Sequence, residues 1–499
     1  MVDGDFFIEK NGIEEKVIDA PPSEVEHGII KDWDKEESAI RRKIDFILIP
    51  TLALAFFSLQ LDRGNISAVL TSTITEDLGI TTNQVNIGSQ LLSAGIVLSE
   101  IPSNFLLQRI GPRTWLSGQL FAWGLVATFQ AFVQSYPAYL VTRILLGLCE
   151  GGFIPGALYY LSTWYKKDET SLRTSLFFYG QMFASATSSL ISAGVLKLSG
   201  TNGMAGWRWI FLIEGVITLF IGIIFTLLVP PSVGDGRPLI SFGRWSYFTE
   251  RESQIMRNRV LLDDPKKARG HIQISKSDVG RALTNPRIMQ HVMLTLVSMT
   301  AFQGLTQYTP TLIKSLGFGS VKANALASVP VYCGIIWLTV LSFLADRLGH
   351  RGPFVLLAIT WNVISYVCLR TDPYDSGKWH RYAVIAITNV SYCSMHILNV
   401  GWLSIYCRTP QERSVAMALV VMGANCAGIS GSQIFRTEDA PKYLNGLTAI
   451  CVLAGVSWLL AAGLGVQTYY GRKSATATDK ESSPSTASYI PQACVPETI

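Results

Sequence analysis

The chain has 499 residues, of which 49% are hydrophobic and only 15% are charged. This balance is too apolar for a soluble globular protein of this size, so it predicts a protein that crosses a membrane many times. The formal net charge of +5 is small, and its distribution among the loops is more informative than its sum.

The sequence carries no motif for enzymatic chemistry. It has no phosphate-binding loop, no HExxH motif and no nucleophile elbow, which disfavours an ATP-driven pump and a membrane hydrolase. Its eight cysteines show no metal-like spacing. We therefore expect no enzymatic activity, no cofactor, no metal and no nucleic-acid partner.

The first 43 residues are predicted to form an N-terminal tail. They hold twelve Asp or Glu against seven Lys or Arg, and they lack the apolar core of a secretory signal peptide. The tail ends in the basic run Arg41-Arg42-Lys43, directly before an apolar stretch. This pattern predicts a disordered tail on the cytosolic side of the membrane.

Twelve apolar stretches follow, each about 20 residues or longer, which is the length a helix needs to cross the hydrocarbon core. They begin near residues 44, 84, 114, 137, 174, 208, 288, 323, 353, 382, 412 and 445. The sequence therefore predicts an all-α polytopic membrane protein with 12 transmembrane helices, arranged as six-helix bundles at 44–229 and 288–470. Residues 471–499 are then a C-terminal tail.

The even number of spans places both termini on one side of the membrane. Basic residues gather in the loops that would then be cytosolic, namely Arg109, Arg113, Lys166, Lys167, Arg173, Arg347, Arg351, Arg408 and Arg413. The opposite loop at 66–83 has no Lys or Arg, although Lys378, Arg381, Arg436 and Lys442 dilute the bias. We expect both termini to be cytosolic.

Residues 230–287 are predicted to form a cytosolic central loop between the bundles, since they hold eleven Lys or Arg against six Asp or Glu. Within them, Thr249 and Glu252 have the spacing of a capping box, which predicts a short helix that carries Ile255 and Met256. We expect this helix to lie at the membrane surface.

An internal repeat relates the two bundles. The segment from Leu106 to Arg113 follows the second span, and the similar segment from Leu344 to Arg351 follows the eighth. Equivalent positions in each bundle are typical of the parallel halves of a secondary transporter. A glycine turn flanked by arginines can bind helix C-termini and nearby acids, so we expect these segments to act as gates. The gating residues would be Arg109, Gly111, Arg113, Asp346, Arg347 and Arg351.

The fourth predicted span carries two charges. At about 100° per residue, Glu150 returns to within about 20° of the helix face of Arg143, roughly 10 Å away along the axis. Gly147 and Gly151 form a neighbouring small-residue stripe that lets another helix approach closely. Charge inside a span usually marks a substrate or ion pathway. The alternative is that Arg143 extends to the interface while Glu150 only stabilises packing.

At these motifs the sequence resembles the major facilitator superfamily over residues 44 to about 470. Within it, the chain is similar to the anion:cation symporter family and to its fungal allantoate permease branch. The motifs that match this branch are Leu61 to Asn65, Arg143 to Gly156, Gly206 to Gly215 and Ala440 to Tyr443. The resemblance implies proton-coupled movement of small organic anions such as ureides, vitamins or carboxylates.

Two positions depart from that resemblance. Gln108 stands where the superfamily loop usually has an acid, although Asp346 keeps the acid in the second bundle. The first gate is then weaker. Tyr406 stands where the fungal branch usually has an asparagine, which leaves the identity of the substrate open.

Arg63 and Arg143 lie at similar depth in the first and fourth spans. Two guanidinium groups that converge on a dry cavity would recognise a carboxylate through paired hydrogen bonds, and the resemblance implies the same role for both. An alternative partner for Arg63 is the adjacent Asp62 on its own helix.

Glu150 is the predicted proton-coupling residue. Burial favours its neutral form while Arg143 favours its charged form, so this carboxyl group could take up and release a proton. An anion at Arg143 would compete with Glu150 and so promote protonation.

Further polar residues on apolar spans either line the cavity or only hold helices together. We place Asn65, Gln307, His396 and Asn425 among the substrate-binding candidates, beside Gln303 and Tyr308. Glu100 and Glu214 are read as structural partners near the membrane edges.

The sequence as a whole favours a monomeric proton symporter of the plasma membrane that imports a small organic anion by rocking its two bundles. Its expected partners are the anion, protons and the lipid bilayer. Two alternatives are an exporter that exchanges a metabolite for protons and a nutrient sensor with little flux.

Overall fold

Helices make up nearly all of the described structure. The computed structural model describes residues 30–233, 235–263, 276–373, 376–391, 394–407 and 410–481. Within these ranges the only extended pairing is the isolated bridge between Ser232 and Asp235, so the predicted all-α class is confirmed. Parts of the predicted features lie outside the described residues: 1–29 of the N-terminal tail, 482–499 of the C-terminal tail, 264–275 of the central loop, and Arg408. The remaining residues of the predicted N-terminal tail, 30–43, are helical rather than disordered, because they form the start of α3.

The first half of the protein contains the first six predicted spans. They correspond to α3 (Ile30–Val69), α5 (Thr82–Ile110), α6 (Pro112–Phe129), α7 (Tyr136–Glu150) with α8 (Phe153–Trp164), α9 (Lys167–Val195) and α10 (Gly206–Leu228). The short helix α4 (Ile74–Asp77) lies between α3 and α5. The fourth span therefore consists of two helices, which the sequence did not predict.

The second half contains the other six predicted spans. They correspond to α13 (Pro286–Ser315), α14 (Ser320–Arg347), α15 (Arg351–Thr371), α16 (Lys378–Val390) with α17 (Ser394–Tyr406), α18 (Pro410–Gly431) and α19 (Leu444–Glu481). The connection between the halves carries α11 (Glu250–Asp263) and α12 (Lys276–Thr284).

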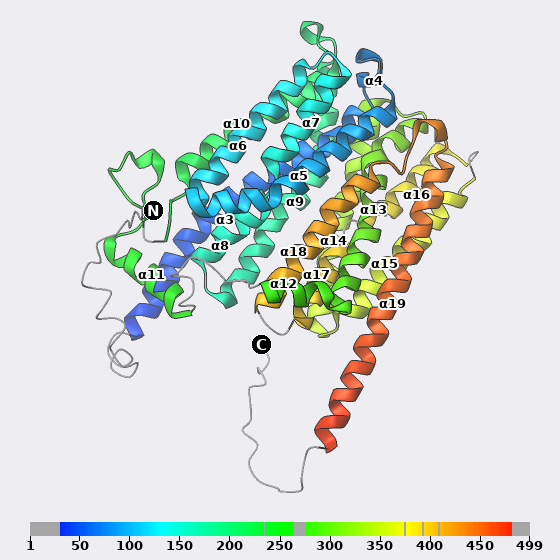
Figure 1. The fold of residues 1–499 in the computed structure, drawn as a ribbon. Helices are drawn as coiled ribbons and strands as arrows, with labels where there is room; N and C mark the ends of the chain where they lie inside the picture. Colours follow the sequence, from blue (N-terminus) through cyan, green and yellow to red (C-terminus); the bar gives the residue numbers. More distant parts are fainter. Residues whose placement is uncertain are drawn as a thin grey trace, which may run out of the picture.

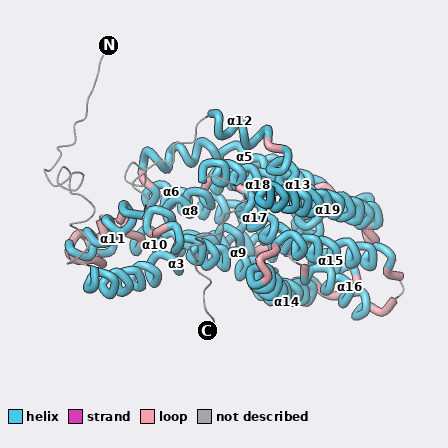
Figure 2. Tube along the Cα trace, turned by 90° about the horizontal axis from the view of Figure 1, so that it is seen from below, coloured by secondary structure: helices cyan, strands magenta, loops and turns pink. Residues whose placement is uncertain are grey.

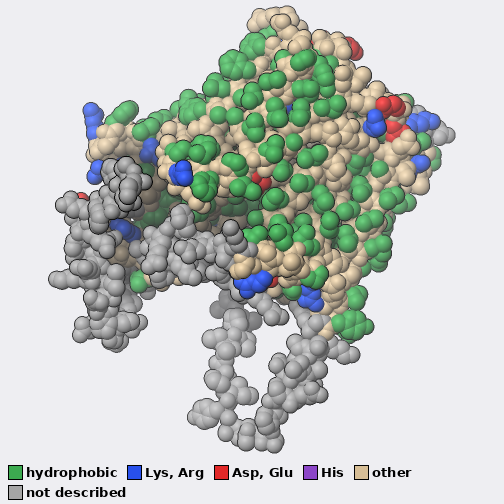
Figure 3. Space-filling view, viewed as in Figure 1, with side chains coloured by type: hydrophobic (Ala, Val, Ile, Leu, Met, Phe, Trp, Pro, Cys, Tyr) green, Lys and Arg blue, Asp and Glu red, His purple; other side chains and the backbone are tan. Residues whose placement is uncertain are grey.

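Nine helical segments of the described chain are long and apolar enough to cross a membrane. The other three predicted spans are helical as well, but α6, α9 and α18 fall short of the same limits of length or apolar content. Large hydrophobic side chains cover much of the outer surface (Figure 3), as a lipid-facing surface requires. Phe46, Ile101, Phe220 and Leu459 are examples, each more than 60% exposed.

The helices form two groups that lie side by side (Figure 2). In the first half, α3 packs on α9 and α10, while α5 packs on α7. In the second half, α13 packs on α18 and α19. The halves meet mainly where α14 contacts α9 and where α18 contacts α5. We call the two ends of the molecule the α4 end and the α11 end (Figure 1); α3 begins and α19 finishes at the α11 end.

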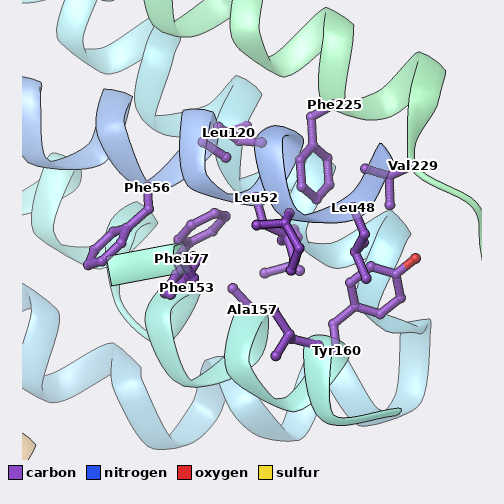
Figure 4. Packing of buried hydrophobic residues seen from close by; sticks show 14 of the residues in the cluster. Leu48, Leu52, Phe56, Leu120, Phe153, Ala157, Tyr160, Phe177, Phe225 and Val229 are labelled. Atoms are coloured by element: carbon purple, nitrogen blue, oxygen red, sulfur yellow. The ribbon is translucent and has the colours of Figure 1, made fainter. Parts of the chain in front are cut away.

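Aromatic side chains fill the core of the first half (Figure 4). The Phe56 ring stacks on the Phe177 ring with a centroid distance of 4.5 Å, and the Trp123 ring meets the Phe153 ring edge to face at 4.9 Å. All four side chains are fully buried. Such aromatic pairs add to the stabilisation that burial alone provides, and they hold α3, α6, α8 and α9 together.

Gly147 and Gly151 allow α7 to approach α5 closely. A Cβ atom on Gly147 would lie 2.1 Å from the Leu92 carbonyl oxygen, and one on Gly151 would lie 1.9 Å from the Ser99 hydroxyl. Neither distance is compatible with a side chain. The predicted packing role of this stripe is confirmed.

Asn86 occupies the buried centre of the contact between the halves at the α4 end. Its Oδ1 accepts hydrogen bonds from the Gln307 amide at 3.0 Å and the Tyr308 hydroxyl at 2.8 Å. Its Nδ2 donates to the Phe435 carbonyl at 3.0 Å. The Asn86 side chain is fully buried, so one residue of the first half joins α13 and the segment after α18 of the second half through uncharged bonds.

Thr71 forms a second contact at the α4 end. Its carbonyl oxygen, just beyond the C-terminus of α3, accepts hydrogen bonds from Lys314 at 2.7 Å and Ser320 at 2.6 Å, and its hydroxyl accepts one from Asn324 at 2.8 Å. A cation at a helix C-terminus also interacts favourably with the helix dipole. The two halves are therefore held together at the α4 end.

The helix α11 docks on the first half. Thr249 and Glu252 exchange the two hydrogen bonds of the predicted capping box, at 3.2 and 2.9 Å, which confirms this helix start. Ile255 and Met256 are buried in the core of the first half rather than lying on the membrane surface. The short apolar face of this helix is therefore covered by protein, and the predicted position of the helix at the membrane surface stays a prediction.

A fully buried arginine anchors α11. Arg259 forms ion pairs with Glu169 at the start of α9 and with Glu37 near the start of α3, the latter at 3.3 Å. Arg41 also pairs with Glu169, at 2.9 Å. Burial alone would raise the pKa of Glu169, but the Arg41 hydrogen bond and the Arg259 charge outweigh it and hold this pKa below its ordinary value of 4.5.

We predict that Arg259→Ala lowers stability by about 3 kcal/mol, because it leaves two acids without their buried partner. Thermal unfolding in detergent measures the change. Arg251→Ala is the matched control, since Arg251 is 72% exposed in its pair with Glu36, and it should cost less than about 1 kcal/mol.

Because the pKa of Glu169 is lowered by folding, the contribution of Glu169 to stability is complete above pH 4.5 and is lost as the pH falls through the folded pKa. The difference between wild type and Arg259→Ala should therefore narrow in acid; a constant difference would contradict this assignment.

We predict that Asn86→Ala opens the α4 end. Three neutral hydrogen bonds of about 1 kcal/mol each are lost, which should raise the population of the opened form at least severalfold. Distances between spin labels at Glu76 and Asn445 would report the opening. Asn83→Ala, at the exposed rim of the same contact, should have a smaller effect, and an unchanged distance distribution for Asn86→Ala would refute this role.

Candidate functional site

A buried ion pair joins the first and fourth spans. The Arg63 Nε of α3 donates to the Glu150 Oε2 of α7 at 2.6 Å. The Glu150 side chain is fully buried, whereas 19% of the Arg63 side chain is exposed. Sequence reasoning offered Asp62 as a partner for Arg63, but the Asp62 carboxylate instead accepts a hydrogen bond from the Thr218 hydroxyl at 2.9 Å.

A small pocket of about 10 Å³, enough space for one water molecule, lies beside this ion pair. Its lining comes from both halves, and the residues are Arg63, Ile96, Glu100, Glu150, Gly152, Ile154, Pro155, Val421 and Asn425. Asn425 on α18 donates to the Glu100 carboxylate on α5 at 3.4 Å. Among the described residues, this is the side-chain hydrogen bond between the halves that lies farthest from the α4 end.

The break between α7 and α8 shapes the wall of the pocket. α7 ends at Glu150, and Gly152 takes a left-handed conformation with φ 79° before α8 begins. Such a break frees backbone carbonyls that need new donors. The Gln119 amide supplies them, donating to the carbonyls of Cys149 at 3.1 Å and Gly151 at 2.9 Å. The break thus places the Glu150 carboxylate at a helix end, and Gln119 pairs two of the carbonyls that the break frees.

Arg143 is buried deeper in the first half than Arg63. Its Nε donates to the Tyr139 hydroxyl at 3.3 Å, and its guanidinium lies 5.3 and 5.4 Å from the rings of Tyr139 and Phe211. One terminal nitrogen of this guanidinium is buried without a hydrogen-bond partner. Aromatic faces stabilise a cation but do not neutralise it, so Arg143 adds positive charge to the bundle that carries Glu150.

Two further acids are buried in the first half. Asp62 and Glu214 are fully buried, and each has one carboxylate oxygen without a hydrogen-bond partner. Glu214 interacts with Ser192 of α9 at 3.4 Å. Sequence reasoning placed Glu214 near a membrane edge, and the structure adds that its side chain is fully buried within the bundle. Neither acid forms an ion pair with any residue that the structure describes.

The structure brings together only some of the predicted site residues. Arg63, Glu150 and Asn425 surround the pocket. Gln307 contacts Asn86 at the α4 end, and the Nδ1 of His396 is buried without a partner. Asn65 is buried, and its Oδ1 has no hydrogen-bond partner. Neither Asn65 nor Arg143 belongs to the pocket lining.

Sequence reasoning missed Glu100 as a pocket residue and Asn86 as a contact between the halves. Glu100 had a usable signal, since it is an acid on an apolar span. Asn86 had none beyond its polarity, because its partners come from the other half of the chain.

The predicted gate segments differ in their charge contacts. In the second half, Arg351 pairs with Asp346 at 2.7 Å, and Gly349 has the left-handed φ of 64° that the turn requires. In the first half, where Gln108 replaces the acid, Arg113 donates to the Thr226 carbonyl at 3.2 Å. Three gate candidates remain. Gly111 ends α5 with a φ of 95°, and the Arg109 guanidinium lies over the Phe105 ring. Arg347 is exposed.

Comparison with known proteins agrees with this architecture. The sequence model described as Major Facilitator Superfamily matches residues 52–432. An uncharacterized transporter of Saccharomyces cerevisiae is 29% identical over 83% of this chain and 77% of its own length. The major facilitator-type transporter hxnP of Emericella nidulans is 26% identical over 89% of this chain and 88% of its own.

Solved structures share the fold. The xylose transporter XylE from E. coli, in a partially occluded inward-open conformation, superposes with a TM-score of 0.63 at 14% identity, covering 83% of this chain and 97% of that one. An inward-facing bacterial homologue of the human lysosomal transporter Spinster superposes with a TM-score of 0.63 at 13% identity, covering 84% and 95%. At these identities the likeness concerns the fold alone.

We predict that Gly152→Ala destabilises the protein by about 2 kcal/mol or more, because alanine resists a left-handed φ. Its Cβ would also lie 2.5 Å from the Ser103 side chain. Thermal unfolding in detergent is the measurement. Gly118→Ala in α6 is the control, because a Cβ there meets no atom within 4 Å and a helical alanine should be neutral or stabilising. Equal unfolding temperatures for both variants would contradict the importance of the break.

Proposed function

As this chain belongs to the major facilitator superfamily and is a membrane transporter, we propose that it takes up a small organic anion together with protons. The anion is a ureide, a vitamin or another small carboxylate. The observation that carries this proposal is the Arg63–Glu150 ion pair, which lies at a pocket between the two halves.

The ion pair supports anion recognition because its arginine is incompletely used. Only the Nε of Arg63 bonds to Glu150, and part of this side chain stays exposed. The terminal N–H groups of a guanidinium can bind a carboxylate through two parallel hydrogen bonds, which a lysine cannot do. Arg63 is therefore the first contact of the anion in this proposal, with Arg143 as a second positive charge behind it.

The same pair supports coupling to protons. An anion at Arg63 competes with Glu150 for one guanidinium, and a buried carboxylate that loses its cation is costly in a low-dielectric bundle. Taking up a proton removes that cost. By linkage, a proton on Glu150 must then promote anion binding as strongly as the anion promotes protonation. In this proposal the anion and Glu150 compete for Arg63, whereas the sequence suggested that they compete for Arg143.

Alternating access follows from the arrangement of the halves. They are joined at the α4 end through Asn86 and Thr71, and along α5 the last side-chain hydrogen bond between the halves that the described residues form is that of Asn425, beside the pocket. In this proposal the anion leaves the pocket toward the α11 end, which carries the basic loops and is taken as the cytosolic side of a monomeric plasma-membrane protein. Uptake requires the α4 end to open and the α11 end to close, with the predicted gate segments holding the second state.

We predict that Glu150→Gln binds the anion but cannot accumulate it against a gradient, because the glutamine carries no exchangeable charge. Uptake into vesicles should no longer rise when the outside is acidified, whereas anion exchange at equal pH should persist. Glu76→Gln is the control and should behave like wild type, because Glu76 is an exposed acid in α4. Normal uphill uptake by Glu150→Gln would rule out this coupling role, and acid-driven efflux would indicate an exporter instead.

A further inference from the structure

We propose that Lys322 and Lys378 bind the phosphate of an anionic phospholipid in the membrane leaflet at the α4 end. The ligand is a glycerophospholipid with net negative charge. Its headgroup contacts both ammonium groups, and its acyl chains lie along α14 and α16. This site is separate from the pocket beside Glu150 and does not depend on the identity of the transported substrate.

Both lysines face one cluster of aromatic rings. The Lys322 ammonium lies 5.5 Å from the centroid of the Phe318 ring and 5.2 Å from that of the Trp379 ring. The Lys378 ammonium lies 5.3 Å from the centroid of the same Phe318 ring. The Phe318 and Trp379 rings contact each other, with their centroids 5.1 Å apart. Two positive charges therefore lie beside one small aromatic surface.

Neither charge is neutralised within the part of the chain that the structure describes. There, neither ammonium group forms an ion pair or a hydrogen bond. Asp372, an acid on the same connection as Lys378, pairs instead with Arg381 at 3.3 Å and lies 3.2 Å from the His380 ring. Aromatic faces stabilise a cation but do not neutralise it. An anion between the lysines would remove the repulsion between their charges.

The positions of both lysines on their helices also favour an anion. Lys322 lies in the first turn of α14 and Lys378 is the first residue of α16, and neither first turn contains an acid. The N-terminus of a helix carries partial positive charge, so a cation there is disfavoured and an anion is favoured. A phosphate at this place therefore interacts favourably with two side chains and two helix ends.

The apolar surface next to the lysines favours a lipid over a soluble anion. α14 and α16 pack side by side (Figure 2), and both belong to segments long and apolar enough to cross a membrane. Val329 follows Lys322 on the same face of α14 and is 48% exposed. On α16, Trp379 and Ile387 are each more than half exposed. Acyl chains can cover this surface while the headgroup stays at the lysines.

The aromatic residues place the cluster at the depth of the lipid headgroups. Trp and Tyr side chains are enriched where a membrane protein passes from acyl chains to headgroups. Trp379 is such a residue, and the Tyr382 ring lies beside it at a centroid distance of 5.9 Å. At this depth a lysine packs its methylene groups on apolar surface and extends its ammonium group to the phosphates.

The experiment measures lipid binding to the purified full-length protein by native mass spectrometry, with unfolding temperatures measured in the same lipids. The probes are long-chain phosphatidylglycerol, long-chain phosphatidylcholine, and glycerophosphoglycerol, which is the anionic headgroup without acyl chains. One variant combines Lys322→Gln with Lys378→Gln, and a second combines Lys322→Arg with Lys378→Arg. Lys197→Gln is the control, because Lys197 is an exposed lysine just beyond α9 in the first half.

We expect wild type to bind phosphatidylglycerol about twentyfold more tightly than phosphatidylcholine, because each basic side chain near an anionic lipid contributes about fivefold. Glycerophosphoglycerol should not bind. The double Gln variant should bind both lipids equally, with the unfolding temperature of wild type in phosphatidylcholine. The double Arg variant keeps both charges and should keep the wild-type preference, as should Lys197→Gln.

Three results would overturn the site. The first is equal binding of the two lipids by wild type, or a preference that survives the double Gln substitution. The second is binding of glycerophosphoglycerol as tight as that of phosphatidylglycerol, which would indicate a site for a soluble anion. The third is an unfolding temperature of the double Gln variant that falls as much in phosphatidylcholine as in phosphatidylglycerol, because the lysines would then stabilise the fold without the lipid.

Discussion

The Arg63–Glu150 ion pair is the constraint on which the first half depends. A charged pair inside a helical bundle is stable only if its geometry is good and the groups around it are paired. The 2.6 Å contact requires α3 and α7 to be held at a fixed depth relative to each other. Three features meet this requirement: the glycine stripe that packs α7 against α5, the aromatic core around α3, and the Gln119 amide that satisfies the carbonyls at the helix break.

The two ends of the molecule use different chemistry. At the α11 end, ion pairs around Arg259 and Glu169 join parts of the first half to one another, so they stabilise that half as a unit. At the α4 end, contacts between the halves centre on the neutral hydrogen bonds of Asn86, with the Lys314 ammonium as a charged donor to the Thr71 carbonyl. The Arg259 ion pairs therefore lie within one half, whereas the centre of the contact between the halves consists of hydrogen bonds between neutral groups.

The sequence predicts the spans well because the membrane sets a length that apolar runs must meet. All twelve predicted spans are helical, and the capping box at Thr249 was found because its signal is local. The partner of Glu150 was not predictable, since helical periodicity gives the face of one helix and not the neighbour in front of it. The place of Glu100 in the pocket lining was missed for the same reason, since its neighbours there, Arg63 and Asn425, come from other helices.

The uncharged centre of the contact at the α4 end has a consequence for the conditions under which the protein works. Hydrogen bonds among an asparagine, a glutamine, a tyrosine and a carbonyl are not screened by dissolved ions and do not titrate between acidic and neutral pH. These central bonds are therefore nearly independent of the salinity and acidity of the medium, unlike the Lys314 contact and the Asn83–Glu438 bond beside them. In dilute, salty or acidic surroundings the centre of the contact keeps its strength, and only its charged surroundings weaken or strengthen.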